Sequence, residues 1–503
     1  MANNVISVRS VSKSFAGVHA LRDINLEILP GEIHCLAGEN GSGKSTLIKI
    51  ISGVYEPDAG TIELNGKAHA RLTPIEAILN GVQVIYQDFS VFPNLTVMEN
   101  LALNTELANK KKIVNWGRFR RIAQQAVAKI DFKVDLDQLV GQLSVADRQL
   151  VAISRALMGE PKLIIMDEPT TALTKKEVDG LFRIILDLKA RGISTLFVSH
   201  KLEEVFEISE RFTILRNGET VITCLPQELD RKTFTRHMTG RDFDEAPFTF
   251  HETEAEPILE VVDLGVDGAF SHVNFSLRRG EILGITGLLG SGRTELALTL
   301  FGGYKSDSGE MRIAGQPVKL HSIRDAIANG IGYVPEDRLT EGLFMDRSIG
   351  DNIIISKIND LISRTGWLKQ SEKRKQEAEW VEKLKIVPSD PENAANTLSG
   401  GNQQRIVLAK WLATNPDILI LNGPTVGVDI GSKHDIHLIL RELAAKGMAI
   451  IIISDDIPEV LQNCNRVLLM KSGRIEREID PATTTEAVLA HFMTDEAPVE
   501  GEH

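Results

Sequence analysis

The sequence is poor in cysteine, and this excludes a disulfide scaffold. Three of the 503 residues are cysteines, namely Cys35, Cys224 and Cys464. Two of them stand beside expected strands in apolar company. We therefore expect buried free thiols rather than disulfide bonds.

Long apolar stretches and an excess of basic residues are also missing. The longest strongly apolar stretch, Met448 to Ile453, has the length of a strand and is far short of the roughly 20 residues of a membrane span. The N-terminus has no basic region followed by a long apolar segment, so no signal peptide is expected. The net charge of −13 argues against nucleic acid as the main partner. These absences predict a cytosolic protein.

One basic cluster stands against this acidic background. It contains Lys110, Lys111, Lys112, Arg118, Arg120 and Arg121, with Trp116 and Phe119 between them. The cluster lies in an expected helical insert. A solvated helix face is the favoured interpretation, and a site for a phosphate backbone is the alternative.

The sequence does contain one set of motifs twice. The first copy comprises Gly38 to Thr46, Gln87, Ser144 to Asp147, Asp167-Glu168 and His200. The second comprises Gly287 to Thr294, Glu336, Ser399 to Asn402, Asn422-Gly423 and Asp455. Each early motif residue of the first copy is separated from its counterpart in the second copy by the same number of positions. For the later motif residues this separation is also constant but slightly larger, as expected after an insertion. Constant spacing of independent motifs indicates a duplicated domain.

Each half has an α/β pattern, in which apolar strands alternate with helical segments. Examples of the strands are 32–37, 163–166 and 195–198, and the first helix is expected to start at Ser45. This order predicts a mostly parallel core sheet with helices around it, and 88–142 reads as a helical subdomain. We expect a first domain at 1–240, an acidic, proline-bounded linker at 241–257 and a second domain at 258–503.

A glycine-rich loop in the first copy has the pattern of a phosphate cradle. It consists of Gly38, Glu39, Asn40, Gly41, Ser42, Gly43, Lys44, Ser45 and Thr46. Glycines let backbone N–H groups surround a β-phosphate without a Cβ in the way. Lys44 would neutralise the β- and γ-phosphates, and Ser45 would bind Mg²⁺ at a helix N-terminus.

Polar residues follow the later strands of the same half. Asp167 ends an apolar strand, where a carboxylate can reach Mg²⁺ through water. Glu168 is placed as the general base for an attacking water, and His200 at the next strand end is expected on the γ-phosphate side. These positions predict nucleotide hydrolysis.

The segment Leu398-Ser-Gly-Gly-Asn-Gln-Gln404 resembles the signature motif of the ABC ATPases. The second loop, Gly-Ser-Gly-Arg-Thr-Glu, and Pro335-Glu-Asp-Arg338 resemble the fused ATP-binding subunit of bacterial monosaccharide importers. Ribose, galactose, arabinose, xylose and autoinducer-2 systems are of this type. The resemblance covers nearly the whole chain.

The resemblance implies two tandem P-loop cassettes paired head to tail, with ATP held between the P-loop of one and the signature of the other. Site one then takes its P-loop, Gln87, Asp167, Glu168 and His200 from the first half and Ser399, Gly400, Gly401 and Asn402 from the second. Within it, Gln87, Glu168 and His200 are the expected catalytic residues. Ser45, Gln87 and Asp167 are the expected Mg²⁺ site.

The resemblance makes site two degenerate. Its own elements are Gly287, Gly290, Ser291, Gly292, Arg293, Thr294, Glu336, Asn422, Gly423 and Asp455, opposed by Ser144, Val145, Ala146 and Asp147. Arg293 can still hold phosphate. Asn422 and Gly423 remove two carboxylates that such importers usually keep. We expect nucleotide binding without hydrolysis, and an empty, drifted site is the alternative.

Adenine stacking and the D-loop differ between the halves. Phe15 is placed to stack on adenine in site one, and Phe270 is a weaker candidate in the second half. Thr174 occupies the position at which many ABC ATPases carry the D-loop aspartate. The second half has this aspartate, as Asp429.

The resemblance implies two permease protomers in the inner membrane and an extracytoplasmic sugar-binding protein as partners. The chain would then be peripheral at the cytoplasmic face, with Gln87 and Glu336 beginning the segments that meet the permease. Uptake of autoinducer-2 or a related small polyol stays open. A soluble ATPase acting on ribosomes is a second class of protein to consider, and the short acidic linker argues against it. A non-enzymatic scaffold is a third, and the intact Glu168 argues against it.

Overall fold

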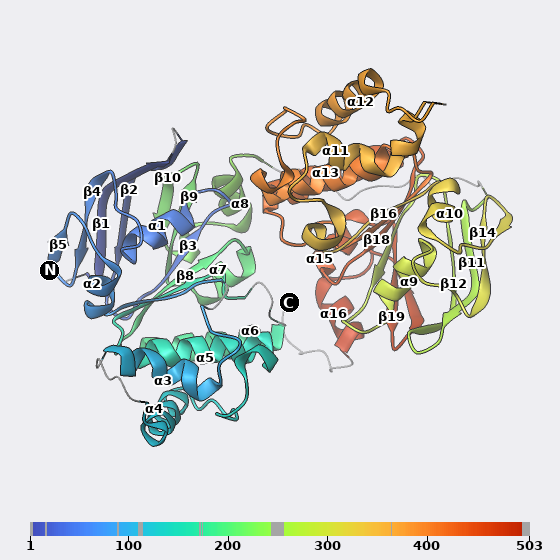
Figure 1. The fold of residues 1–503 in the computed structure, drawn as a ribbon. Coiled ribbons are helices and arrows are strands. Elements are labelled where there is room, and N and C mark those ends of the chain that lie inside the picture. The colour runs from blue at the N-terminus through green and yellow to red at the C-terminus, as the bar shows by residue number, and fades with distance from the viewer. Residues whose placement is uncertain are drawn as a thin grey trace. The chain divides into compact units, whose positions relative to one another are not determined.

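The structure is a computed structural model that describes residues 4–15, 18–87, 90–108, 114–170, 173, 175–242, 256–363 and 365–494. The chain forms two compact units, Met1–Asp242 and Phe243–His503 (Figure 1). Lys110 to Lys112, Thr174 and most of the expected linker lie outside the described residues.

The first unit contains two sheets. Its strands are β1 (Ile6–Phe15), β2 (Val18–Ile28), β3 (Ile33–Ala37), β4 (Ala59–Leu64), β5 (Lys67–His69), β6 (Val82–Ile85), β7 (Leu163–Asp167), β8 (Ser194–Ser199), β9 (Arg211–Arg216) and β10 (Glu219–Cys224). The core sheet has the order β10-β9-β3-β8-β7-β6 and is parallel except for β10. An antiparallel sheet has the order β2-β1-β4-β5.

Helices surround this core sheet and build a separate helical part. They are α1 (Lys44–Ile51), α2 (Pro74–Leu79), α3 (Val97–Ala108), α4 (Trp116–Ala128), α5 (Val145–Leu157), α6 (Lys175–Ala190), α7 (Leu202–Ile208) and α8 (Arg231–Thr239). Helices α3, α4 and α5 contact one another around a cluster of their own that includes Leu101, Phe119 and Val151. This is the helical subdomain that the sequence predicts, extended to include α5.

The second unit repeats this plan. Its strands are β11 (Leu259–Val266), β12 (Phe270–Leu277), β13 (Ile282–Thr286), β14 (Ser308–Ile313), β15 (Gln316–Val318), β16 (Ile331–Val334), β17 (Ile418–Asn422), β18 (Ala449–Ile453), β19 (Arg466–Lys471) and β20 (Arg474–Ile479). The sheet orders, β16-β17-β18-β13-β19-β20 and β12-β11-β14-β15, match those of the first unit. Its helices are α9 (Arg293–Leu300), α10 (Ile323–Ala328), α11 (Ile349–Ile354), α12 (Gln370–Lys383), α13 (Gly400–Leu412), α14 (Ile430–Ala445), α15 (Ile457–Asn463) and α16 (Glu486–Thr494).

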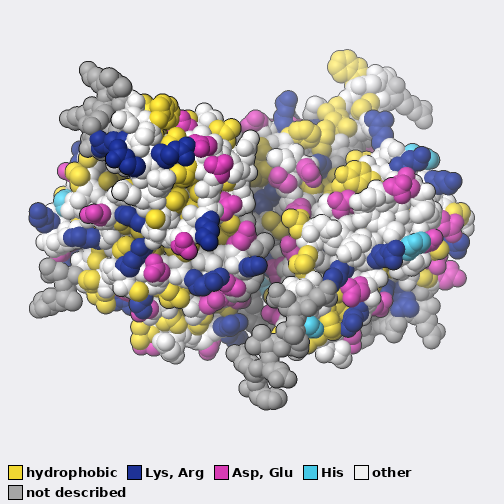
Figure 2. Space-filling model, turned by 90° about the horizontal axis from the view of Figure 1, so that it is seen from below, with side chains coloured by type: hydrophobic (Ala, Val, Ile, Leu, Met, Phe, Trp, Pro, Cys, Tyr) yellow, Lys and Arg dark blue, Asp and Glu magenta, His cyan; other side chains and the backbone are white. Residues whose placement is uncertain are grey.

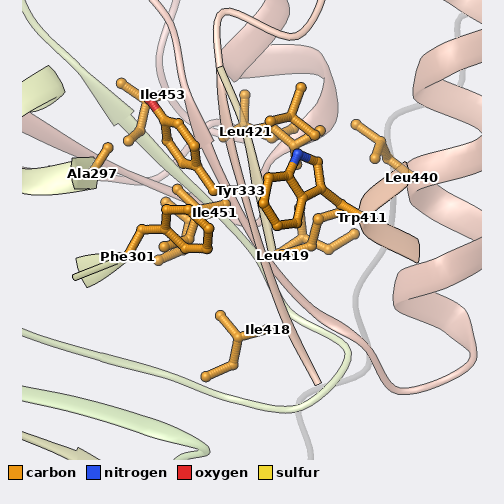
Figure 3. Close-up of a cluster of buried hydrophobic side chains, with 14 of the residues drawn as sticks. Ala297, Phe301, Tyr333, Trp411, Ile418, Leu419, Leu421, Leu440, Ile451 and Ile453 are labelled. Atoms are coloured by element: carbon orange, nitrogen blue, oxygen red, sulfur yellow. The ribbon is translucent and has the colours of Figure 1, made fainter. Parts of the chain in front are cut away.

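Apolar burial explains why the core sheets form where they do. Strands β3, β13 and β18 are buried at every residue, as expected for parallel strands covered on both faces. In the second unit the rings of Phe301 and Tyr333 stack with centroids 5.0 Å apart, and Trp411 meets Phe301 edge-on (Figure 3). These contacts connect the segment after α9, strand β16 and helix α13 in one core.

The sequence predictions of two α/β cassettes and of free thiols are confirmed. All three cysteines are buried and free. The antiparallel sheets were not predicted. No helix among the described residues is long and apolar enough to cross a membrane. On the face shown in Figure 2, Lys and Arg side chains are interspersed with Asp and Glu.

Candidate functional site

The glycine-rich loop of the first unit connects β3 to α1, and its glycines are required by close packing. A Cβ at Gly38 would lie 2.4 Å from the Leu215 carbonyl oxygen, and one at Gly43 would lie 2.7 Å from the Ala20 carbonyl oxygen. Gly43 is also the N-cap of α1, with a left-handed φ of 105°. Helix α1 begins at Lys44, one residue before the expected start, so Lys44 occupies its first turn.

Lys44 is a buried cation at the centre of this loop. Its Nζ donates hydrogen bonds to the carbonyl oxygens of Gly38 at 2.6 Å and Glu39 at 2.9 Å. Burial lowers the pKa of Lys44, while the nearby carboxylates of Glu168 and Asp167 oppose that shift. A buried ammonium at a helix N-terminus is a strong site for an anion such as phosphate.

Asp167 and Ser45 form a pair of oxygen ligands beside Lys44. Asp167 ends β7, and its carboxylate hydrogen-bonds the Ser45 hydroxyl in the first turn of α1. Burial, followed by the charge of Glu168, raises the pKa of Asp167 to about 6. A hydroxyl and a carboxylate are the hard oxygen donors that Mg²⁺ prefers, so the residues present fit that ion.

Glu168 and His200 act as one unit at the ends of two neighbouring strands. The Glu168 Oε1 atom lies 3.1 Å from Nδ1 of His200, which follows β8. Burial alone would raise the pKa of Glu168, but the hydrogen bond and charge of His200 and the charge of Lys44 lower it below its ordinary value. Glu168 is therefore ionised at neutral pH and able to accept a proton from water.

The backbone at Glu168 is strained. Its φ is 47°, a left-handed conformation that costs a residue with a side chain about 1–2 kcal/mol. Gly423, the matching residue of the second unit, has φ 57°. The same turn therefore exists in both units, and only the first retains a carboxylate on it.

The other predicted residues of site one take separate positions. Gln87 is exposed just after β6, Asn40 and Gly41 are exposed on the loop, and Ser45 is exposed in the first turn of α1. The Phe15 side chain is 40% exposed and packs edge-on against Tyr55, with ring centroids 5.2 Å apart. Nζ of Lys13 lies 5.5 Å from the centroid of the Phe15 ring, and stacking of this ring on a base stays a prediction.

The second glycine-rich loop keeps the same backbone. A Cβ at Gly287 would lie 2.2 Å from the Met470 carbonyl oxygen, and Gly292 is the left-handed N-cap of α9. Arg293 is only 7% exposed, and its Nη2 atom pairs with Asp455 at 3.2 Å. Within the described part of the chain, the buried Nη1 of Arg293 has no hydrogen-bond partner. Arg293 thus places a buried cation at the start of α9, as Lys44 does at the start of α1.

Beside this loop, apolar and neutral groups replace the two carboxylates. Buried Asn422 hydrogen-bonds the hydroxyl of Tyr333, whose pKa is raised to about 12 by burial. A Cβ at Gly423 would lie 2.9 Å from Cγ2 of Val426 and 3.0 Å from Cγ of Glu336. A side chain at position 423 would therefore have to displace Val426 or Glu336. Asn422, Tyr333 and Glu336 line a pocket of about 400 Å³ together with Thr294.

The two signature serines differ in their hydrogen bonds, which the sequence analysis missed. In the first unit, Ser144 donates its hydroxyl proton to the Asp147 carboxylate at 2.9 Å. In the second, the Ser399 hydroxyl accepts a hydrogen bond from the Asn402 amide at 3.1 Å, and this bond does not use the hydroxyl proton. The sequence Ser-x-x-Asp is a helix-capping pattern and was a usable signal for the first arrangement.

Three sequence interpretations are corrected or refined here. Phe270 is 4% exposed and belongs to the hydrophobic core, so it is wrong as a stacking residue. Phe119 of the basic cluster is buried, whereas Arg120 pairs with Asp137 at 2.7 Å. Asp429 is the N-cap of α14 and accepts a hydrogen bond from the Ser432 N–H.

The raised pKa of Asp167 predicts a pH-dependent stability. The folded protein holds this carboxyl at a pKa of about 6 against an ordinary value of 3.8. The contribution of the Asp167 carboxyl to the free energy of unfolding is therefore fully present at pH values below its ordinary pKa. This contribution is lost as the pH rises through the pKa of the folded protein. We expect Asp167→Asn to raise the thermal midpoint of the nucleotide-free chain by roughly 2–4 °C at about pH 8, with less gain at about pH 5.

Asn422 offers the matched control in the second unit. Asn422→Asp creates a buried carboxyl at the equivalent strand end, so the midpoint should fall as the pH rises over the same range. Thermal unfolding of both variants at the two pH values measures the effect. An equal gain for Asp167→Asn at both pH values would contradict the assignment.

Comparison with known proteins agrees with this geometry. A family model described as ABC transporter matches residues 21–171 and 270–426. The ribose import ATP-binding protein RbsA of Halalkalibacterium halodurans is 41% identical over 97% of this chain and 98% of its own length. The protein of that name in Bacillus subtilis is 38% identical over 97% of this chain and 99% of its own length.

Solved structures give similar matches to one cassette at a time. A crystal structure of an ATP-binding cassette of an ABC transporter in its ADP conformation is 27% identical, with a TM-score of 0.40. The match covers 45% of this chain and 92% of the other. The family model and the relatives that match over nearly their whole length together assign the chain to a family. The chain belongs to the ABC transporter family and is an ABC ATPase with two cassettes.

Proposed function

We propose that this chain is the ATP-hydrolysing subunit of a monosaccharide importer, with ribose as the first candidate sugar. The observation that carries the proposal is the convergence of Lys44, Asp167, Glu168 and His200 at the ends of β3, β7 and β8. The names of relatives that match nearly the whole chain support ribose import.

The first P-loop and the second signature form the working nucleotide site in this proposal. Lys44 and the loop N–H groups bind the β- and γ-phosphates, and Ser399 donates its hydroxyl to the γ-phosphate from the other cassette. Ser45 and Asp167 would hold Mg²⁺, which would neutralise charge on the phosphates when bound. Glu168 accepts a proton from the attacking water, while His200 fixes the orientation of its carboxylate.

The second P-loop binds nucleotide without hydrolysing it. The buried Nη1 of Arg293 supports phosphate binding, because an N–H group without a partner gains most from an acceptor. Gly423 supplies no base, and the Ser144 proton is already donated to Asp147. Asn422 is neutral, so Mg²⁺ fits this site poorly. ATP therefore organises the second site, and turnover belongs to the first.

The partners follow from the same proposal. The importer needs two permease protomers in the inner membrane and an extracytoplasmic sugar-binding protein. This chain would then lie peripherally at the cytoplasmic face. ATP-driven closure of the cassettes and release after hydrolysis would drive the permease.

Uptake of labelled sugar in cells tests this function. Deleting the gene should abolish high-affinity uptake of labelled ribose, and the wild-type chain should restore it. The Glu168→Gln chain, expressed to the same level, should not. Unchanged ribose uptake with loss of another monosaccharide or of autoinducer-2 would reassign the substrate. Unchanged uptake of every tested compound would overturn the proposal of an importer.

A further inference from the structure

Arg338 is not among the residues proposed to bind or hydrolyse ATP, yet its side chain contacts separate segments of the second cassette. It opens a single π-helical turn, Arg338–Gly342, just after Glu336. Its guanidinium donates to the carbonyl oxygens of Val426 at 2.7 Å and Gly427 at 3.1 Å and to Oε1 of Gln403 at 3.3 Å. One side chain thus joins three separate segments.

The first of these segments is the signature itself. Gln403 lies on α13, and its Nε2 donates to the carbonyl oxygens of Ala395 at 3.3 Å and Leu398 at 3.1 Å. Leu398 immediately precedes Ser399. A Cβ at Gly400 would lie 2.8 Å from Nη2 of Arg338. The guanidinium therefore packs directly under the signature glycine and also supports the residue before the signature serine.

The second segment leads from β17 toward Asp429. The carbonyl groups of Val426 and Gly427 both point at Arg338, and Gly427 has a left-handed φ of 66°. A Cβ at Gly400 would lie 3.1 Å from the Gly427 oxygen. The signature and this segment are thus in close packing, and Arg338 provides the hydrogen bonds between them.

The π-helical turn is fixed at its other end as well. Nζ of Lys410, a buried residue of α13, donates to the Gly342 carbonyl oxygen at 3.0 Å. Trp411, the next residue of α13, belongs to the aromatic core shown in Figure 3. The turn 338–342 is therefore attached to the signature helix at both ends, and that helix is attached to the core sheet.

We propose that Arg338 is a positioning residue that holds the signature Ser399-Gly400-Gly401 in its productive geometry for ATP hydrolysis. The inference rests on the proposed use of that signature in the working nucleotide site. A planar guanidinium suits this task, because it can serve several acceptors at fixed angles. The altered segment of the second cassette then supports catalysis at the first P-loop.

Steady-state ATP turnover by the full-length chain tests this role. Arg338→Ala should lower kcat about tenfold, while KM for ATP changes by less than about threefold, because Lys44 and its loop still bind the nucleotide. Arg338→Lys should recover part of kcat, since an ammonium can satisfy some of the three acceptors. A structural role alone would not produce this split between kcat and KM.

Arg405→Ala is the matched control. Arg405 lies on α13, the helix that begins at Gly400. It donates to the carbonyl oxygens of Leu384 and Lys385 and to Asp435, and none of these residues belongs to the signature. Its loss should lower the thermal midpoint as much as Arg338→Ala does but leave kcat within about twofold. A wild-type kcat for Arg338→Ala, or equal kcat losses in both variants, would overturn the inference.

The proposed function is tested separately in the same assay. Glu168→Gln must lower kcat by about 10²–10⁴-fold if the first P-loop is the working site. Turnover that persists in Glu168→Gln overturns the proposed function. Turnover that is lost there, together with a normal Arg338→Ala, overturns only the role of Arg338.

Discussion

Glu168→Gln should reduce kcat for ATP hydrolysis by about 10²–10⁴-fold, the range that a general base supplies. Glutamine keeps the size of the side chain but cannot accept a proton from water. The lowered pKa of Glu168, maintained against burial by His200 and Lys44, keeps it ionised and ready for this step. Phosphate release from the purified chain, with bound nucleotide counted in parallel, measures the effect.

ATP binding should survive in this variant, because Glu168 is not part of the glycine-rich loop. Glu76→Gln is a suitable control, since Glu76 is an exposed residue in the capping box of α2 of the same unit and glutamine can also cap. It should leave turnover within about twofold of wild type. Substantial turnover in Glu168→Gln would mean that the second site hydrolyses ATP, even though Asn422 and Gly423 supply no carboxylate.

Much of the first site was predictable because its parts are local or lie at strand ends. The loop from Gly38 to Lys44 is one strand–turn–helix unit, so its function follows from residues adjacent in sequence. Asp167 ends β7 and His200 follows β8, and β8 lies between β3 and β7 in the parallel part of the sheet, so the ends of these strands meet at one edge. The pairing of Glu168 with His200 then needs only the sheet order.

Other features could not be predicted because they depend on tertiary contacts. Arg338 finds Gln403 and Val426 at sequence separations of 65 and 88 residues, and no local pattern indicates those partners. Phe270 was misjudged because its position in the sequence does not reveal that β12 faces the core. The antiparallel sheet was detectable in part, since Asp267-Gly268 between β11 and β12 is a hairpin signal.

Lys44→Met should weaken ATP binding at the first site roughly 10- to 100-fold, and turnover should fall with it. Lys44 is a buried cation, and a hydrogen bond to a charged group contributes about 1.5–3 kcal/mol. Methionine keeps the length of the side chain without the charge. Equilibrium binding of labelled ATP, fitted for stoichiometry as well as affinity, gives the measurement together with the turnover rate.

Arg293→Met is the matched change in the second unit, because Arg293 stands at the same first position of the loop helix. It should reduce the number of nucleotides bound per chain from two to one while lowering turnover far less than Lys44→Met. The reason is chemical, since the loop at Arg293 can bind phosphate but has no base beside it. If the two variants lost turnover equally, the sites would share catalysis. If Arg293→Met still bound two nucleotides, binding at the second loop would not depend on Arg293. A wild-type chain that bound only one nucleotide would mean that the second loop holds none.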